Sequence, residues 1–562
     1  MKKLKYILVA TVLFSAYSCN EDEWLKEKPL EFYAPDNSYE TTQQFNKALN
    51  YLYDGLRRFF WSIGDQGALM HMGDLSYGGT DYDPHMKFND VKNFVTPTNY
   101  VPGHFWDWSY NAIANANTII ARINMENKVT SDQKKAIEGE ALFFRAYYYR
   151  TLADIFGDAP IVVEEAKEPK RDYVRATRDE VYDQARMDLE KAITLLGDVN
   201  NVKDGAISKQ ACQHLLAEVY ISLKNYPKAI EAASAVINHP EMSLMTARFG
   251  SRATFEGDPY WDLFQLNNQN RTSGNKETIL VLQHEYQNSG SSYSTEMLRW
   301  LLPYYPGARA EAKNGGETNA FATFTAEKGG RGIGVNHPTY YFCYGLWGND
   351  FDNDLRNSSY MIVRDVKIDN PNAKGFGEWM VKDGWLLDKD TVRNFYPFVM
   401  KFSRVGYFPD EAYEKRADGS LRTTELGEHY LLNVNNMCNW SFKDEYLFRL
   451  AGTYLLRAEA YLGNGEKGKA AEDLNAIRAR AKASPVTADQ IDFDFILDEQ
   501  MRELYFEDWR VQTLLRRGKF VERSRKYNPA GMNVADHQNL FPVPFSEIER
   551  NILSPMPQNP GY

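Results

Sequence analysis

The sequence predicts a mainly α-helical protein in which helical repeats form the body and a large, loop-rich insertion interrupts them. Apolar residues recur at the helical period of 3.6 in several segments of residues 39–240 and again in residues 441–562. Between these parts, residues 241–440 are rich in Gly and Asn and show no sustained helical period. We therefore expect an N-terminal and a C-terminal helical part that pack together as one body, with the insertion added to it.

The chain begins with a short export signal, MKKLKYILVATVLFSAYSC. Three lysines precede the apolar stretch Tyr6–Tyr17, which is shorter than the about 20 residues that span a bilayer. Cys19 follows, in an order that resembles a bacterial lipoprotein signal, although Tyr17 stands where a small residue is usual. We expect a signal peptide over residues 1–18, lipidation of Cys19 and a tether over residues 19–38. An ordinary secretory signal with a cysteine nearby is the alternative.

Charge and cysteine content exclude several classes of protein. The 562 residues carry a formal net charge of −11, and removal of the signal lysines makes the mature chain more acidic. Such a chain is poorly suited to neutralise the phosphates of a nucleic acid, so we expect no nucleic-acid partner. After Cys19 only Cys212, Cys343 and Cys438 remain, an odd number without metal or redox spacing, which argues against a disulfide framework and against a metal site.

The first helices can be placed by their periodicity and their boundary residues. A helix is expected over about Tyr39–Trp61, followed by a loop-like segment at residues 62–102 and a helix at about His104–Ile123. A third helix, about Ser131–Ile155, should end at Gly157, a usual helix stop. The next helix should begin after Thr177, because Thr177 and Glu180 have the spacing of a capping box.

Residues 207–240 carry the clearest internal repeat. They predict a helix, a tight turn at Asn225–Pro227 and a second helix, with small alanines where the two helices must approach closely. This segment resembles a tetratricopeptide repeat, and a second copy follows at residues 444–481. Residues 131–196 predict a looser pair. Because a single unit cannot bury its own apolar face, the units should stack, closing the array across the insertion.

Several longer stretches resemble the SusD/RagB family of surface nutrient-binding lipoproteins from Bacteroidetes-type bacteria. These stretches cover most of both helical parts and barely touch the insertion: WDWSYNAIANANTIIARI (residues 106–123), EGEALFFRAYYYRTLADIFGDAPIV (138–162), YLLRAEAYLGNGEKGKAAEDLNAIRARA (454–481), MRELYFEDWRVQTLLRRGKF (501–520), FPVPFSEIERN (541–551) and the terminal QNPGY. The chain departs from the usual family pattern at Gln500–Met501 and at Glu507–Asp508, and we expect neither departure to change the fold.

The resemblance implies a cell-surface protein that captures an oligo- or polysaccharide and delivers it to a SusC-like TonB-dependent outer-membrane transporter. It implies a lipid anchor in the outer membrane, no enzymatic activity and no cofactor, and the helical side is expected to dock on the transporter. The acidic run Asn20–Glu23 resembles the surface-export signals of such lipoproteins. The alternative is a peptide-binding, RagB-like lipoprotein that serves the same kind of transporter.

A glycan-binding face needs flat aromatic rings for the apolar faces of sugars, with carboxylates or amides for their hydroxyls, on a rigid scaffold. Two stretches fit: the early loop DLSYGGTDYD at residues 74–83, and the insertion with its cluster of Trp and Tyr. We predict that the ligand is bound by Asp81, Tyr82, Trp261, Trp300, Tyr305, Tyr340 and Trp347, with Tyr77, Tyr304 and Tyr344 in the same stretches. Large aromatic residues are usually buried, so a core role competes at each position.

Three motif-like segments point to other functions and are weaker. Residues 463–470 imitate a P-loop, but a predicted helix, not a strand, precedes them. Asp350, Asp352 and Asp354 begin like an EF-hand loop that lacks its Gly and its bidentate Glu, which leaves only a looser calcium site open. Acidic pairs such as Asp81 and Asp83 could serve a glycosidase, but sequence neighbours do not establish the required separation.

Overall fold

The computed structural model describes residues 38–61, 64–79, 85–286, 296–321, 324–387, 391–402, 408–432, 438–529 and 531–562. These residues are mostly helical, as predicted. The N-terminal helical part contains α3 (Thr42–Trp61), α4 (Gly64–Met70), α5 (Val91–Phe94), α6 (Tyr100–Ile123), α7 (Ser131–Phe156), α8 (Arg178–Leu195), α9 (Lys209–Ser222) and α10 (Tyr226–Ile237). The signal and all of the expected tether except residue 38 lie outside the described residues.

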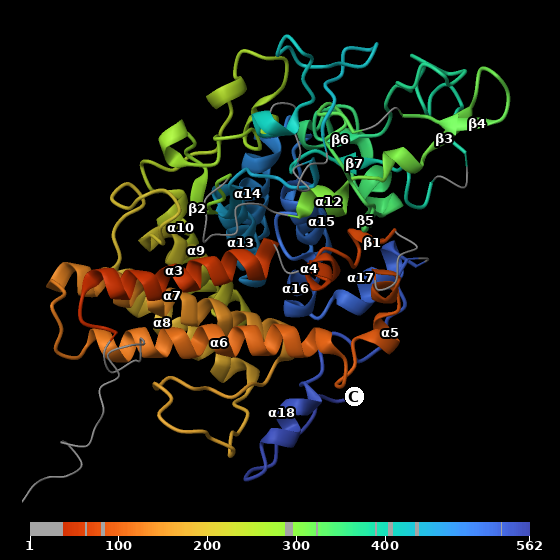
Figure 1. Cartoon of the computed structure of the whole chain (residues 1–562). Coiled ribbons are helices and arrows are strands. Elements are labelled where there is room, and N and C mark those ends of the chain that lie inside the picture. The colour runs from red at the N-terminus through yellow and green to blue at the C-terminus, as the bar shows by residue number, and fades with distance from the viewer. Residues whose placement is uncertain are drawn as a thin grey trace, which may run out of the picture.

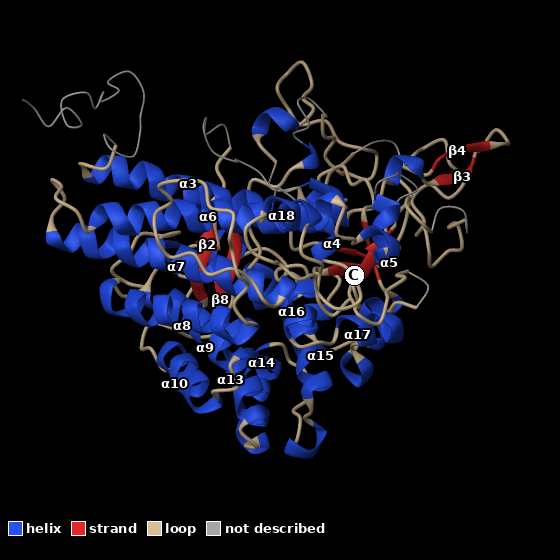
Figure 2. Ribbon diagram, turned by 90° about the horizontal axis from the view of Figure 1, so that it is seen from below, coloured by secondary structure: helices blue, strands red, loops and turns tan. Residues whose placement is uncertain are grey.

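Consecutive helices of this part pack side by side: α6 on α7, α7 on α8, α8 on α9 and α9 on α10 (Figures 1 and 2). The capping residues explain the boundaries. Thr130 and Gln133 form a capping box at the start of α7, and Thr177 and Glu180 form the predicted one at the start of α8. Gly157, with φ of 76°, ends α7 where a side chain would be strained. The expectation of a continuous loop at residues 62–102 is wrong, because this segment includes α4 and α5.

The C-terminal helical part completes the array. It contains α13 (Leu450–Gly463), α14 (Lys467–Arg480), α15 (Phe493–Leu504), α16 (Arg510–Arg516), α17 (Phe520–Tyr527) and α18 (Phe545–Arg550). Helix α13 packs against both α10 and α14, so the two predicted helix pairs are neighbours in space although about 200 residues separate them. In the structure the helices on either side of the insertion are thus in direct contact.

The insertion contains short strands and helices joined by turns, and it occupies the upper part of the view in Figure 1. Its elements are β2 (Thr278–Leu282), β3 (Arg309–Glu311), β4 (Glu317–Asn319), β5 (Asn336–Pro338), β6 (Ile362–Val363), β7 (Phe398–Val399), α11 (Pro259–Asp262) and α12 (Met297–Leu301). The strands form antiparallel pairs, β3 with β4 and β6 with β7 inside the insertion. Two further pairs tie the insertion to the helical parts: β1 (Ser76–Gly78) with β5, and β2 with β8 (Glu445–Arg449).

A buried ion-pair network joins the insertion to α15. The Arg356 guanidinium lies 2.6 Å from Asp354, 2.8 Å from Glu499 and 3.2 Å from Glu503, and all four side chains are buried. Burial alone would raise the pKa of Glu499, but Arg356 and its other arginine neighbours outweigh this and hold that pKa at about 2. The insertion is therefore fixed to the helical body through paired charges as well as apolar packing.

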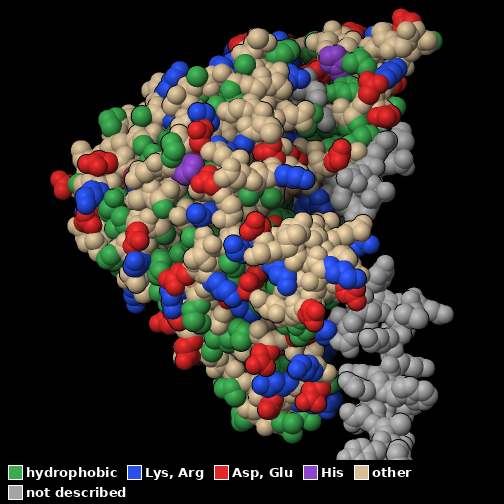
Figure 3. All heavy atoms as spheres, turned by 90° about the vertical axis from the view of Figure 1, so that its left-hand side faces the viewer, with side chains coloured by type: hydrophobic (Ala, Val, Ile, Leu, Met, Phe, Trp, Pro, Cys, Tyr) green, Lys and Arg blue, Asp and Glu red, His purple; other side chains and the backbone are tan. Residues whose placement is uncertain are grey.

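None of the helices in the described part combines the length and the apolar character needed to cross a membrane. On the face at the left-hand side of Figure 1, acidic and basic side chains are interspersed and no basic patch gathers (Figure 3). Cys212, Cys343 and Cys438 are buried, and none of these three thiols is joined to another described cysteine by a disulfide.

Candidate functional site

The early loop and the insertion meet in space through one pair of strands. Strand β1, at the start of the early loop, pairs with β5 of the insertion, so that Ser76 faces Pro338 and Tyr77 faces His337. The rings of Tyr77 and His337 stack with their centroids 4.7 Å apart. The two stretches that the sequence marked as ligand-binding are therefore neighbours, although more than 250 residues separate them in the chain.

The base of the early loop is anchored by charge. The buried carboxylate of Asp74 accepts two hydrogen bonds from Arg510, both 2.7 Å, and one of 2.6 Å from Arg523. Burial alone would raise the pKa of Asp74, but the two guanidinium groups outweigh it and lower that pKa, so the carboxylate stays charged. The hydroxyl of Thr339 donates to the backbone carbonyl of Asp74 at 2.9 Å and so links this base to the residue after β5.

A turn of π-helix, Tyr341–Gly345, comes shortly after β5, and its buried side contacts the helical body. The Tyr341 hydroxyl donates to Asp498 of α15 at 2.7 Å, and the Tyr341 ring stacks on Tyr527 of α17 at 3.8 Å. The Nε1 group of buried Trp347 donates to the carbonyl of Phe342 at 2.7 Å. The turn is consequently rigid, because both sides of its buried face are bonded to the helical body or to the core.

Above this turn lies a group of aromatic rings that we call the aromatic platform: Tyr340, Tyr344 and Phe351. Tyr340 is 78% exposed and Tyr344 is 38% exposed, and their ring centroids are 5.0 Å apart. The rings of Tyr344 and Phe351 are nearly parallel, with 8° between their planes and 6.4 Å between their centroids. A row of rings on a fixed turn is a surface on which the apolar faces of sugar rings can stack.

One cation supports the platform. The guanidinium carbon of Arg364 lies 4.7 Å from the Phe351 ring centroid and 5.5 Å from that of Tyr344. Arg364 also donates to the carbonyl of Cys343 at 2.6 Å and to the side chain of Asn357 at 2.5 Å. Burial lowers the pKa of this guanidinium, but an arginine remains charged at neutral pH. Arg364 thereby fixes the orientation of two platform rings.

The predicted ligand-binding residues fall into three groups. Tyr340 belongs to the platform, and Asp81 and Tyr82 lie outside the described residues. Trp261 is half-buried, and its ring lies 5.7 Å from that of Tyr360. The remaining three are core residues, because at most 2% of each is exposed: Trp300, Tyr305 and Trp347. Their rings present no face to solvent in this structure, so each serves as a core residue.

Sequence reasoning did not find Phe351 and Arg364. Tyr340 and Tyr344 are four residues apart, the spacing that places two side chains on one face of a helix, and this was a signal that could have singled out Tyr344 beside Tyr340. Phe351 and Arg364 lie beside these rings only because the chain reverses direction after two short 3₁₀-helical turns, Gly348–Asp350 and Leu355–Asn357. No local pattern in the sequence indicates that return.

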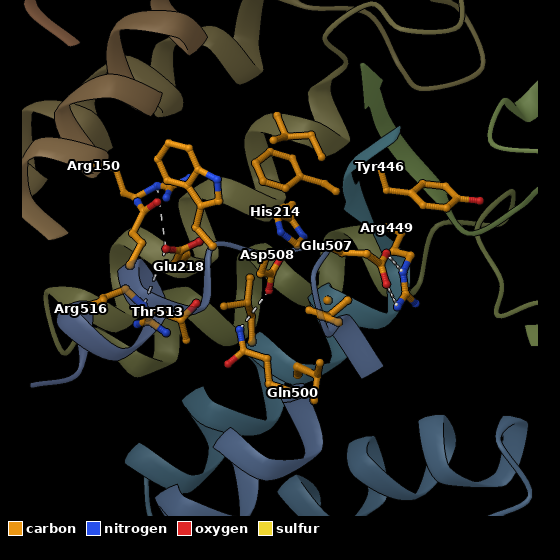
Figure 4. Close-up of a pocket in the computed structure, with 18 of the residues that line it drawn as sticks. Arg150, His214, Glu218, Tyr446, Arg449, Gln500, Glu507, Asp508, Thr513 and Arg516 are labelled. Atoms are coloured by element: carbon orange, nitrogen blue, oxygen red, sulfur yellow. Dashed lines mark hydrogen bonds and ion pairs between the residues drawn. The ribbon is translucent and has the colours of Figure 1, made fainter. Parts of the chain in front are cut away.

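The interior also contains a charged cavity of about 80 Å³ between α7, α9, α13 and α15–α16 (Figure 4). Figure 4 shows Arg150 and Arg516 pointing toward Glu218, and Arg449 toward Glu507. The volume corresponds to a few water molecules. The cavity is too small to hold a sugar chain, and several of the charges that line it are paired with one another.

The motif-like segments have structural explanations. Asp350 accepts hydrogen bonds from Ser484 and pairs with Arg478 at 2.6 Å, and Asp354 pairs with Arg356 at 2.6 Å. Two carboxylates of the EF-hand-like run are thus committed to arginines. Residues 463–470 form the turn between α13 and α14, where the element before the turn is a helix.

The fold and site define a helical-repeat protein that carries exposed aromatic rings on a long insertion. Comparison with known families gives two matches: the SusD family over residues 300–562, and a family described as starch-binding and associating with the outer membrane over residues 74–221. The chain belongs to the SusD/RagB family, as the sequence resemblance implied.

Relatives and solved structures agree with this assignment. SusD-like protein P2 of Formosa agariphila is 25% identical over 589 aligned residues that cover all of both chains. The starch-binding protein SusD of Bacteroides thetaiotaomicron is 38% identical over 125 residues, 21% of each chain. A laminarin-binding SusD-like protein shares the fold with a TM-score of 0.65, 21% identity, and coverage of 93% of this chain and 100% of the other. Surface glycan-binding protein A of Bacteroides thetaiotaomicron, solved with laminarihexaose, gives a TM-score of 0.64 at 17% identity, covering 92% and 99%.

Proposed function

We propose that this protein is a cell-surface, non-catalytic lipoprotein that captures an oligo- or polysaccharide and passes it to a SusC-like TonB-dependent outer-membrane transporter. The observation that carries the proposal is the aromatic platform: exposed rings on a turn bonded to the helical body, beside the early loop. Membership of a family described as starch-binding and outer-membrane-associated supports it.

The remaining parts of the proposal rest on the sequence. Cys19 supplies the lipid anchor, and residues 19–38 allow the body to move over the transporter while it stays attached. The helical side, opposite the insertion, is the docking side. Co-purification of the lipidated protein with a SusC-like transporter from solubilised outer membranes tests this partner, and a gene neighbourhood without such a transporter argues against it.

Isothermal titration of residues 20–562 against a panel of polysaccharides and a peptide mixture tests the ligand. The panel should include starch and laminarin, the polysaccharides after which two of these similar proteins are named. Heat with a polysaccharide supports the proposal, heat with peptides alone selects the peptide-binding alternative, and release of shorter sugars contradicts the non-catalytic role.

The double variant Tyr340→Ala/Tyr344→Ala tests the site. Each ring should contribute about 1 kcal/mol of stacking, so we expect the affinity for the polysaccharide to fall about tenfold or more. The matched control is Phe545→Ala, which removes an exposed aromatic ring (44%) from α18 on the helical body. If the double variant binds like the wild type, the platform is not the binding face.

A further inference from the structure

A second pocket lies on the helical body, away from the insertion. It has a volume of about 200 Å³ and opens between α3 and α6, which run side by side in Figure 1. Its floor is formed by buried Leu52, Ala112 and Tyr148, the last of these from α7. Tyr51, Gly55, Asp107, Trp108 and Asn111 complete the lining.

A glycine keeps this pocket open. Gly55 lies in the interior of α3, where glycine destabilises a helix by roughly 1 kcal/mol relative to alanine. Its backbone has no left-handed conformation, and a Cβ atom placed on it would meet no atom of the described residues within 4 Å. Neither the backbone conformation nor close packing of neighbouring atoms therefore requires glycine at this position. The one effect of the missing side chain that the structure shows is space in the pocket.

The polar groups around this space include unused hydrogen-bonding capacity. Asp107 forms no hydrogen bond or ion pair with any described residue, and partial burial raises the pKa of its carboxyl group. The Tyr51 hydroxyl donates to the Asn111 side-chain oxygen at 3.1 Å, bridging α3 and α6. Within the described part of the chain, the amide nitrogen of Asn111 donates to no group, and so it remains available to a ligand.

The aromatic residues give the pocket a flat, apolar side. Trp108 and Tyr51 both line it, and Tyr51 is 54% exposed. The Trp108 ring lies 5.8 Å from the ring of His104, one turn earlier on α6, which fixes its position. Two aromatic rings, a free carboxylate acceptor and a free amide donor are the groups that recognise the C–H face and the hydroxyls of a sugar.

We propose that this pocket between α3 and α6 is a second carbohydrate site, which holds a single pyranose unit. Its volume is below the about 300–1,000 Å³ of pockets for larger ligands, and this limits the occupant to one ring. It shares no residue with the aromatic platform, because its lining comes from α3, α6 and α7 alone. The site goes beyond the proposed function, because it needs neither the insertion nor a transporter.

Saturation-transfer difference NMR on residues 20–562 with the methyl pyranosides of glucose, galactose and mannose tests this site. Gly55→Leu should fill the pocket, and Asp107→Asn should remove the charged acceptor. We expect binding of the recognised pyranoside to weaken about tenfold or more in each variant, the effect of losing one well-placed contact. In Tyr340→Ala/Tyr344→Ala the same binding should be unchanged, which separates this site from the platform.

Gly55→Ala is the matched control for folding. Because a Cβ atom at this position meets nothing, this variant should unfold at a higher temperature than the wild type and still bind the pyranoside. If Gly55→Leu does not fold, as judged by circular dichroism, Asp107→Asn decides alone, because Asp107 is exposed and forms no hydrogen bond or ion pair with a described residue, although the charge of Arg550 acts on it. Absence of pyranoside binding to the wild type, or unchanged binding in Asp107→Asn, overturns the proposal.

Discussion

Two runs of aromatic residues in this protein have similar compositions and opposite environments. Tyr147, Tyr148 and Tyr149 follow one another in α7, and at most 1% of each is exposed. In the insertion, Tyr340 is 78% exposed and Tyr344 is 38% exposed, although buried aromatic residues surround them. The difference lies in the neighbours, because α7 contacts α3, α6, α8, α9 and α16, whereas the turn at Tyr341–Gly345 is covered from one side.

This comparison shows how the molecule divides its tasks. A helix surrounded on all sides uses its aromatic rings for packing, and the resulting body is rigid. The insertion lacks regular elements long enough to surround each ring, so it is held by specific bonds to that body and leaves some rings exposed. An aromatic surface on which a ligand can bind is therefore left where the insertion rests on the rigid helical body and no further element covers its rings.

The strongest way to break this arrangement is to remove the charge that joins the insertion to α15. Arg356→Leu leaves the buried carboxylates of Asp354, Glu499 and Glu503 without one of their cations. We expect the free energy of unfolding to fall by about 3–5 kcal/mol, measured by urea denaturation. Arg525→Leu is the control, because Arg525 and its partner Asp536 are at the surface and the loss should be about 0.5 kcal/mol or less. Equal losses in the two variants would contradict the role of the network.

The next largest effect should separate buried from exposed tryptophans within the insertion. Trp347→Ala removes a ring that is 2% exposed and the hydrogen bond from Nε1 to the Phe342 carbonyl. We expect a loss of about 3–4 kcal/mol in unfolding free energy. Trp379→Ala, at a ring that is 38% exposed, should lose about 1 kcal/mol or less. Thermal denaturation of both variants measures these losses. If the Trp347→Ala protein is as stable as the wild type but binds the glycan more weakly, Trp347 is a ligand-binding residue and not a core residue.

The same contrast explains how far the sequence could predict this structure. The pairs α9–α10 and α13–α14 were predicted with their partner helices because local spacing, small residues and turn residues all agree within about 35 residues. Tyr340 and Trp347 differ in exposure although they are seven residues apart in the same loop-rich segment. Tyr341, which lies between them, contacts Asp498 and Tyr527, more than 150 residues later, and no local pattern encodes such contacts. The candidate site was therefore predicted by region and only partly by residue.

The smallest effect concerns Asp508, a buried carboxylate on the helical side that forms no ion pair with any described cation. Asp508 lines the charged cavity and accepts a hydrogen bond from Gln500 at 3.1 Å. Burial, together with nearby Glu507, raises its pKa from 3.8 to about 6. Because the folded state holds this proton more tightly than the unfolded state, the contribution of Asp508 to stability grows as the pH falls from about 6 toward 3.8 and is lost above pH 6.

Replacing Asp508 with asparagine should remove that dependence. Asn has the same shape and can still accept from Gln500, but it carries no charge to be desolvated. We expect Asp508→Asn to increase the free energy of unfolding by on the order of 1 kcal/mol at pH 7.5 and to leave it nearly unchanged at pH 4. Denaturation curves at both pH values measure this. The increase should disappear at low pH only if the ionised carboxylate is the cause. An equal gain at both values would instead assign the effect to packing and would show that the helical body tolerates this buried charge without cost.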